Sequence, residues 1–150
     1  MRATLQRHNN LSYARNEVVI CNGSTQALFN ALLSTLAPDD EVLVPAPYWA
    51  PYLDQVWLTG GTPVIIPCPQ NNNFKLRPCD LQEAITARTR WLIINNPVNP
   101  SGAVYSQQEL SDIAAVLLQH PDIWISPMAS TSISCSMAFM RRHWPRSSLV

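Results

Sequence analysis

The stretch WLIINNPVNPSGAVYS, residues 91–106, contains the pattern that decides the fold. Its first five residues form a short apolar run that predicts a buried strand. Two prolines and a glycine follow, so the strand ends in a loop with little conformational freedom to lose. The peptide bond between Asn99 and Pro100 is a candidate for the cis form, which some tight turns adopt. A loop this stiff can hold an amide at a fixed distance from a ligand, and Asn99 is the candidate residue.

Other short apolar runs on both sides of this stretch also predict strands, at 17–21, 41–45, 62–67 and 122–125. Helical periodicity lies between them. One helix follows Gly23, and a second ends at Gly60. Asp80 with Glu83 predicts a capping box at the start of a third helix, and Ser106 predicts the cap of a fourth. The apolar faces of the first and the last helix are expected to be Ala27, Leu28, Ala31, Leu32 and Leu36, and Leu110, Ile113, Ala114, Leu117 and Leu118.

Strands that alternate with helices predict an α/β fold, mainly a parallel sheet with covering helices. In such sheets ligands bind beyond the carboxyl ends of the strands. Three segments leave strand ends in this sequence: NGST, APYW and NNPVNPSG. A glycine-rich dinucleotide fingerprint and a lysine-containing phosphate loop are both absent from it.

The first two segments carry candidate ligand-binding residues. In NGST, Gly23 allows a tight turn into a helix whose first N–H groups, together with the hydroxyls of Ser24 and Thr25, can bind a phosphate. In APYW, Trp49 can stack on a flat heterocycle. Taken alone, the first segment is equally consistent with an ordinary helix cap, and Trp49 is equally consistent with a residue that fills the core.

Composition narrows the class of partner. The 150 residues carry a formal net charge of +0, which gives no electrostatic case for binding nucleic acid or an anionic membrane. No apolar run reaches the length of a membrane span. The four cysteines are scattered without a CxxC pair, so they favour reduced thiols of a cytoplasmic protein over a disulfide framework or a metal site.

Taken together, CNGSTQALFNALL, DEVLVPAPYWAPY, GGTPV and NNPVNPSGAVYSQQEL resemble the class I aminotransferases, which are pyridoxal-phosphate enzymes of fold type I. The chain is most similar to the aspartate and aromatic aminotransferase branch. The resemblance implies that residues 1–125 are part of the large, cofactor-binding domain, with an incomplete sheet. It also implies pyridoxal 5′-phosphate as cofactor, an amino acid and a 2-oxo acid as substrates, and a homodimer.

The resemblance assigns roles to single residues. Gly23, Ser24 and Thr25 match the segment that holds the cofactor phosphate. Trp49 matches the aromatic residue that stacks on the pyridine ring. Asn99 matches the asparagine that donates to the phenolic oxygen of the cofactor and faces the substrate carboxylate.

The lysine that forms the Schiff base in the family has no counterpart in this sequence. Lys75 is the only lysine, and it lies in the polar segment after the 62–67 run. No catalytic residue is therefore assigned, and we expect a catalytically incomplete fragment without transaminase turnover. Two alternatives stay open: a non-catalytic remnant that binds cofactor weakly or not at all, and another fold type I enzyme such as a lyase.

Residues 126–150 contain no aspartate, glutamate or glycine and match no motif of the family. We expect this segment to be out of frame or disordered. With suitable synonymous codons, the same nucleotides read in another frame give Asp-Gly-Ile-Tyr-Glu-His-Leu, close to the segment that follows the fifth strand in the family. Met128 and Met137, which have one codon each, both fall where the shifted frame needs part of an aspartate codon.

Overall fold

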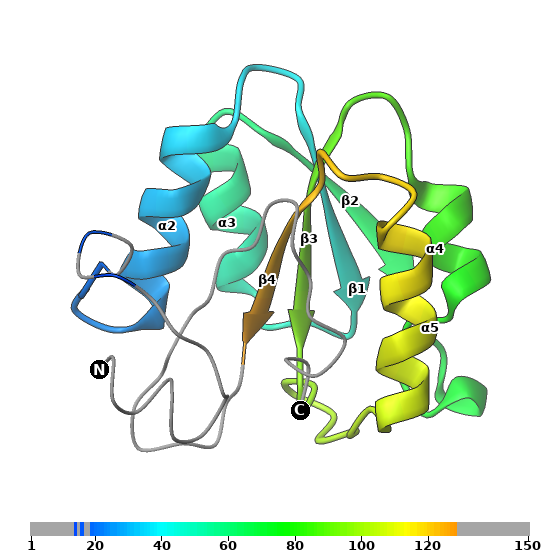
Figure 1. Cartoon of the computed structure of the whole chain (residues 1–150). Helices are drawn as coiled ribbons and strands as arrows, with labels where there is room; N and C mark the ends of the chain where they lie inside the picture. Colours follow the sequence, from blue (N-terminus) through cyan, green and yellow to red (C-terminus); the bar gives the residue numbers. More distant parts are fainter. Residues whose placement is uncertain (1–13, 15, 17–18, 129–150) are drawn as a thin grey trace.

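The computed structural model describes residues 14, 16 and 19–128, which are built around one parallel sheet (Figure 1). The strands lie in the order β2-β1-β3-β4, and all three pairings are parallel. This arrangement confirms the α/β class and the parallel sheet expected from the sequence. The strand bounds are Glu41–Ala46 for β1, Thr62–Pro67 for β2, Thr89–Asn95 for β3 and Trp124–Met128 for β4.

Helices cover both faces of the sheet (Figure 1). Side chains alternate between the faces along a strand, so Trp91 and Ile93 of β3 face one layer of helices while Leu92 and Ile94 face the other. The first layer contains α2 (Ser24–Thr35) and α3 (Pro51–Leu58). The second contains α4 (Pro78–Ala84) and α5 (Gln107–Leu117), with the short 3-10 helix η2 (Gln70–Asn72) before them in the chain. The sheet therefore separates two apolar cores.

A charged cluster fixes the amino ends of β1 and β3. The carboxylate of Glu41 accepts a hydrogen bond from the Thr86 hydroxyl at 2.5 Å and two from the Arg88 guanidinium at 2.6 and 3.0 Å. The backbone N–H of Glu41 donates to the carbonyl of Arg88 at 2.9 Å. Because the Glu41 side chain is only 5% exposed, these bonds replace the water that it gives up on folding.

The predicted strand at 17–21 is wrong for the residues of it that the structure describes. Val19, Ile20 and Cys21 lie in no strand, and Val19 and Ile20 are 82% and 76% exposed. Glu17 and Val18 lie outside the described residues. A strand needs a neighbour for its backbone groups, and the apolar run finds none in the described sheet.

The helix starts were predicted correctly at one place and wrongly at another. Ser106 caps α5 as expected and forms a capping box with Glu109. The capping box predicted at Asp80 is wrong, because α4 begins at Pro78 with Arg77 at the cap position. Proline is preorganised for the first helical position, which explains the earlier start. Asp80 instead accepts hydrogen bonds from the guanidinium of Arg77 at 2.5 and 2.7 Å.

Most of the predicted apolar helix faces are buried or partly buried; the exception is Leu118, which follows α5 and is 54% exposed. The strand predicted at 122–125 is present as β4, which begins two residues later than predicted and extends to Met128. The remainder of the predicted 126–150 tail lies outside the described residues. Among the helices that the structure describes, none is long and apolar enough to cross a membrane.

Candidate functional site

The loop at residues 96–102 is closed by its own backbone. Val98 donates to the carbonyl of Ala103 at 2.8 Å, and Gly102 donates back to the carbonyl of Val98 at 2.7 Å. Gly102 has φ +73°, a conformation that side chains disfavour. Asn99 lies in this closed loop and is exposed, and its bond to Pro100 is cis. The loop thus presents one exposed amide from a constrained backbone.

Asn96 ties this loop to the segment that follows it. Its Oδ1 accepts a hydrogen bond from the backbone N–H of Tyr105 at 3.1 Å. The hydroxyl of Tyr105 in turn accepts from the backbone N–H of Leu76 at 2.8 Å. Burial raises the pKa of Tyr105 to about 12, so this phenol stays protonated at neutral pH.

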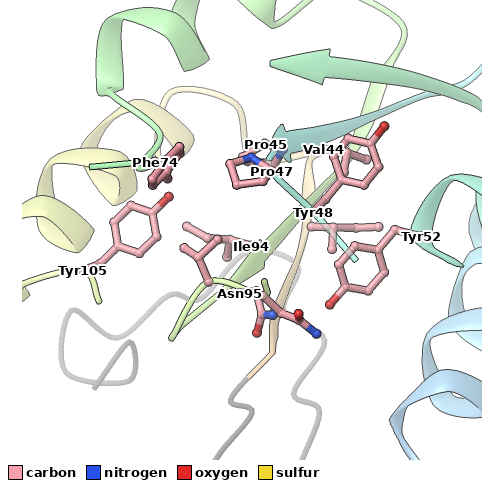
Figure 2. Close-up of a pocket in the computed structure, with 12 residues that line it drawn as sticks. Val44, Pro45, Pro47, Tyr48, Tyr52, Phe74, Ile94, Asn95 and Tyr105 are labelled. Carbon is pink, nitrogen blue, oxygen red and sulfur yellow. The ribbon is translucent and has the colours of Figure 1, made fainter. Parts of the chain in front are cut away.

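A pocket lies beyond the carboxyl ends of β1 and β3 (Figure 2). It is a small pocket with room for about one water-sized molecule, and it is partly open to solvent. Asn95, the last residue of β3, contributes a buried Oδ1 atom that has no hydrogen-bond partner. The residues that line the pocket are Val44, Pro45, Pro47, Tyr48, Tyr52, Phe74, Ile93, Ile94, Asn95, Val98, Asn99 and Tyr105.

The segment after β1 places its aromatic residues beside this pocket. Tyr48 and Tyr52 line it, and Trp49 packs edge-on against Tyr52 with ring centroids 5.4 Å apart and an interplanar angle of 79°. Trp49 is partly buried and packs against the core on the α2/α3 face of the sheet. Its ring is therefore held in one orientation while part of it stays accessible.

The amino end of α2 lies at the same end of the sheet as the carboxyl ends of the strands (Figure 1). Gly23 is its N-cap residue with φ +88°, and no side chain caps the helix. Ser24 is partly exposed and Thr25 is exposed. The first turn contains no acidic residue, so the exposed N–H groups and the helix dipole favour an anion there.

Of the residues predicted from the sequence, Asn99 lines the pocket and Trp49 contacts Tyr52, which lines it. Gly23, Ser24 and Thr25 do not line it; they lie at the amino end of α2. Sequence reasoning missed Asn95, Phe74 and Tyr105. The strand-end position of Asn95 was a usable signal, whereas nothing local marked Phe74 as a pocket residue.

Lys75 forms an ion pair with Glu109 and does not line the pocket. Its Nζ atom lies 2.9 Å from both carboxylate oxygens of Glu109, and its side chain is only 18% exposed. The backbone N–H of Ser106 and then the Lys75 ammonium lower the pKa of Glu109. The charge of this lysine is therefore used to hold the segment before α4 against α5.

A parallel α/β sheet with a loop-lined pocket at its carboxyl edge is a class of fold that binds small ligands. A family profile for aminotransferase class I and II matches residues 1–126. The chain is 48% identical over 120 residues to an aspartate/prephenate aminotransferase of Cereibacter sphaeroides. It is 44% identical over 125 residues to an aspartate aminotransferase of Rhizobium meliloti. These alignments cover 80% and 83% of this chain and 30% of each relative.

Solved structures give the same result. The crystal structure of the aspartate aminotransferase from Rhizobium meliloti matches with a TM-score of 0.83 and 36% identity, over 99% of this chain and 37% of that one. The Thermus thermophilus aspartate aminotransferase with maleate matches with a TM-score of 0.80 and 35% identity, over 85% and 33%. The chain belongs to the aminotransferase class I and II family, and it spans about 30% of the length of these curated relatives.

Proposed function

We propose that this chain carries part of the cofactor site of a pyridoxal-phosphate-dependent aminotransferase. Membership of the aminotransferase class I and II family supports the proposal. Two observations carry it: Asn99 lines a pocket whose lining also includes Tyr52, the residue that Trp49 packs against. At the same end of the sheet as the carboxyl ends of the strands, α2 begins without a side-chain cap (Figure 1).

The described residues fit a flat, phosphorylated ligand. The uncapped N–H groups after Gly23, with the hydroxyls of Ser24 and Thr25, would hold the phosphate. Trp49 would stack on the pyridine ring, because part of its indole is accessible while Tyr52 fixes its orientation. The site contributes hydrogen-bond donors and an aromatic face, and the helix end supplies the favourable potential for the phosphate charge.

When bound, the cofactor supplies an electron sink for the transfer of an amino group between an amino acid and a 2-oxo acid. In that complex Asn99 would donate its amide N–H to the phenolic oxygen of the cofactor and would orient the substrate carboxylate. The closed loop around Gly102 keeps this amide from moving away, so little conformational freedom is lost when the ligand binds. The residues of this chain therefore bind and orient the reactants.

We further propose that the chain alone does not catalyse the transfer. Its only lysine, Lys75, is paired with Glu109 and is not among the residues that line the pocket. This pairing also favours the second candidate function, a non-catalytic remnant of the enzyme. For the whole protein we propose a homodimeric, cytoplasmic aminotransferase. Within it, residues 1–125 would belong to the large domain and residues 126–150 would be unrelated to the family.

Titration calorimetry with pyridoxamine 5′-phosphate tests the proposal without the need for a lysine. We expect saturable one-to-one binding. The variants Thr25→Val and Asn99→Ala should each weaken it about tenfold, since each removes a hydrogen bond to the ligand, one of them to a charged group. The matched controls Thr62→Val and Asn71→Ala, at exposed positions away from the proposed cofactor residues, should bind normally. If the Thr25→Val and Asn99→Ala variants bind pyridoxamine 5′-phosphate with the wild-type dissociation constant, the assignment of these residues is contradicted.

A further inference from the structure

An asparagine followed by a glycine lies directly before α2. Asn22 and Gly23 form the only Asn-Gly pair in the sequence. Both residues are exposed, and a Cβ atom added at Gly23 would meet nothing within 4 Å. The pair therefore lies in open space at the start of the helix.

An asparagine side chain can react with the backbone nitrogen of the residue that follows it. At this position the nitrogen of Gly23 would attack the side-chain carbonyl carbon of Asn22. The bond from that carbon to the amide nitrogen breaks, ammonia leaves, and a five-membered succinimide ring forms. Water then opens the ring to give aspartate or isoaspartate, so water is the only co-reactant. A side chain on the second residue hinders the attack, and glycine has none.

The contacts of Asn22 leave its side chain available for this reaction. Its backbone N–H donates to Oε1 of Gln26 at 2.7 Å, but its side-chain amide makes no hydrogen bond within the part of the chain that the structure describes. The attacking N–H of Gly23 donates to the carbonyl of Cys21 at 3.0 Å. This bond must open before the attack, and opening costs little because the bond closes a turn at exposed residues.

The other exposed asparagines among the described residues are less suited to the reaction. Asn16 and Asn73 precede glutamate and phenylalanine, whose side chains hinder the attack. Asn30 and Asn71 lie within α2 and η2, where the helical backbone fixes the next nitrogen. Asn99 precedes a proline, whose nitrogen carries no hydrogen to lose. The reaction is thus favoured at the position before Gly23.

Deamidation at this position would place a new negative charge beside the start of α2. The helix has no side-chain cap and no acidic residue in its first turn, so its N–H groups and its dipole favour an anion there. A carboxylate at position 22 would take up part of this favourable potential. It would also repel a phosphate bound to the same N–H groups.

We propose that Asn22 is a deamidation site, and that its conversion to aspartate or isoaspartate weakens the binding of a phosphorylated ligand at the start of α2. The modification follows from the Asn-Gly pair and its exposure. Its effect on the ligand rests on the proposed function, which assigns the ligand phosphate to Gly23, Ser24 and Thr25.

Ageing of the full 150-residue chain tests the modification. Wild type and Asn22→Gln are incubated at mildly alkaline pH, and their peptides are then mapped by mass spectrometry. In wild type, the peptide that contains residue 22 should gain the mass of an amide-to-acid conversion and appear as both aspartate and isoaspartate. The glutamine side chain is one carbon longer and closes a ring less readily, so Asn22→Gln should stay unchanged. Conversion at Asn30 or Asn71 as fast as at Asn22, or an intact Asn22, would overturn the proposal.

Calorimetric titration with pyridoxamine 5′-phosphate tests the effect on the ligand. The variant Asn22→Asp, which carries the charge of the product, should bind about tenfold more weakly than freshly purified wild type. The control Asn22→Gln should bind as wild type does. Equal affinities of wild type and Asn22→Asp would overturn the effect on the ligand while the proposed function stands. If fresh wild type does not bind, the proposed function fails and this effect falls with it, whereas the peptide masses still decide the modification.

Discussion

The two ends of the sheet use their polar groups differently. At the amino end, the buried carboxylate of Glu41 is satisfied by Thr86, Arg88 and Thr89, so these groups bond to one another. At the carboxyl end, the buried Oδ1 of Asn95 has no partner.

Other polar groups at the carboxyl end are accessible. Asn99 and Thr25 are exposed, and α2 begins without a side-chain cap. Protein polar groups left without protein partners cost stability unless water or a ligand satisfies them. The comparison indicates that the polar groups at the amino end of the sheet stabilise the fold, whereas those at the carboxyl end of the sheet are available for a ligand.

The largest expected effect on stability is at the amino end. Glu41→Gln removes the charge that holds Thr86 and Arg88 and should lower the free energy of unfolding by about 2–3 kcal/mol. Urea denaturation followed by circular dichroism measures this. The control Glu83→Gln, at an exposed position, should change stability by less than about 0.5 kcal/mol. Equal effects of the two variants would remove the distinction between a structural and a solvated carboxylate.

Low pH should reduce the stability that the Glu41 cluster gives to the amino end of the sheet. The Thr86 hydroxyl, and after it the Arg88 guanidinium, hold the pKa of Glu41 below its usual value near 4.5. Because the folded pKa is the lower one, this contribution is present above pH 4.5 and is lost as the pH falls through the folded pKa. The stability of wild type should therefore fall more steeply below pH 4.5 than that of Glu41→Gln. Parallel pH profiles would contradict this account.

An intermediate effect is expected beside the pocket. Tyr105→Phe removes the hydroxyl that accepts from the buried backbone N–H of Leu76, and should cost about 1 kcal/mol in urea denaturation. Lys75→Met breaks a pair in which Glu109 is 42% exposed, so its cost should be only about 0.5 kcal/mol. A larger loss for Lys75→Met than for Tyr105→Phe would show that the ion pair, and not the hydroxyl, fixes this segment.

The smallest effect on stability is expected where the effect on binding is largest. Asn99→Ala alters an exposed side chain and should change the free energy of unfolding by less than about 0.5 kcal/mol. The same variant should bind pyridoxamine 5′-phosphate about tenfold more weakly. If Asn99→Ala instead destabilises the chain by several kcal/mol, the carboxyl end is structural, like the amino end.

The sequence predicted those parts of the fold that depend on local pattern. The strand Thr62–Pro67 was predicted at its observed bounds, and Ser106 was correctly predicted as a helix cap; the structure adds Glu109 as its capping-box partner. The error at Asp80 arose where two start signals lay close together, and the proline at position 78 prevailed. The run at 17–21 has strand composition, but composition does not reveal whether a neighbouring strand is present.

Asn99 and Thr25 were chosen as candidates because they lie in segments that leave strand ends, where ligands bind in parallel sheets: Asn99 is in the loop after β3, and Thr25 is in the first turn of α2. Leu76 and Tyr105 are 29 residues apart in sequence, and the hydrogen bond between them joins the segment before α4, which contains Phe74, to the segment before α5. No local pattern encodes that contact. The functional roles of Gly23, Ser24, Thr25, Trp49 and Asn99 stay predictions.

The most direct test of the central claim is a titration with pyridoxamine 5′-phosphate followed in one ¹H–¹⁵N nuclear magnetic resonance series. The account predicts that the backbone signal of Thr25, the indole N–H of Trp49 and the side-chain amide of Asn99 shift together along one saturable curve with one dissociation constant. Signals that shift in only one of the three segments, or along curves with different dissociation constants, would contradict a single shared ligand.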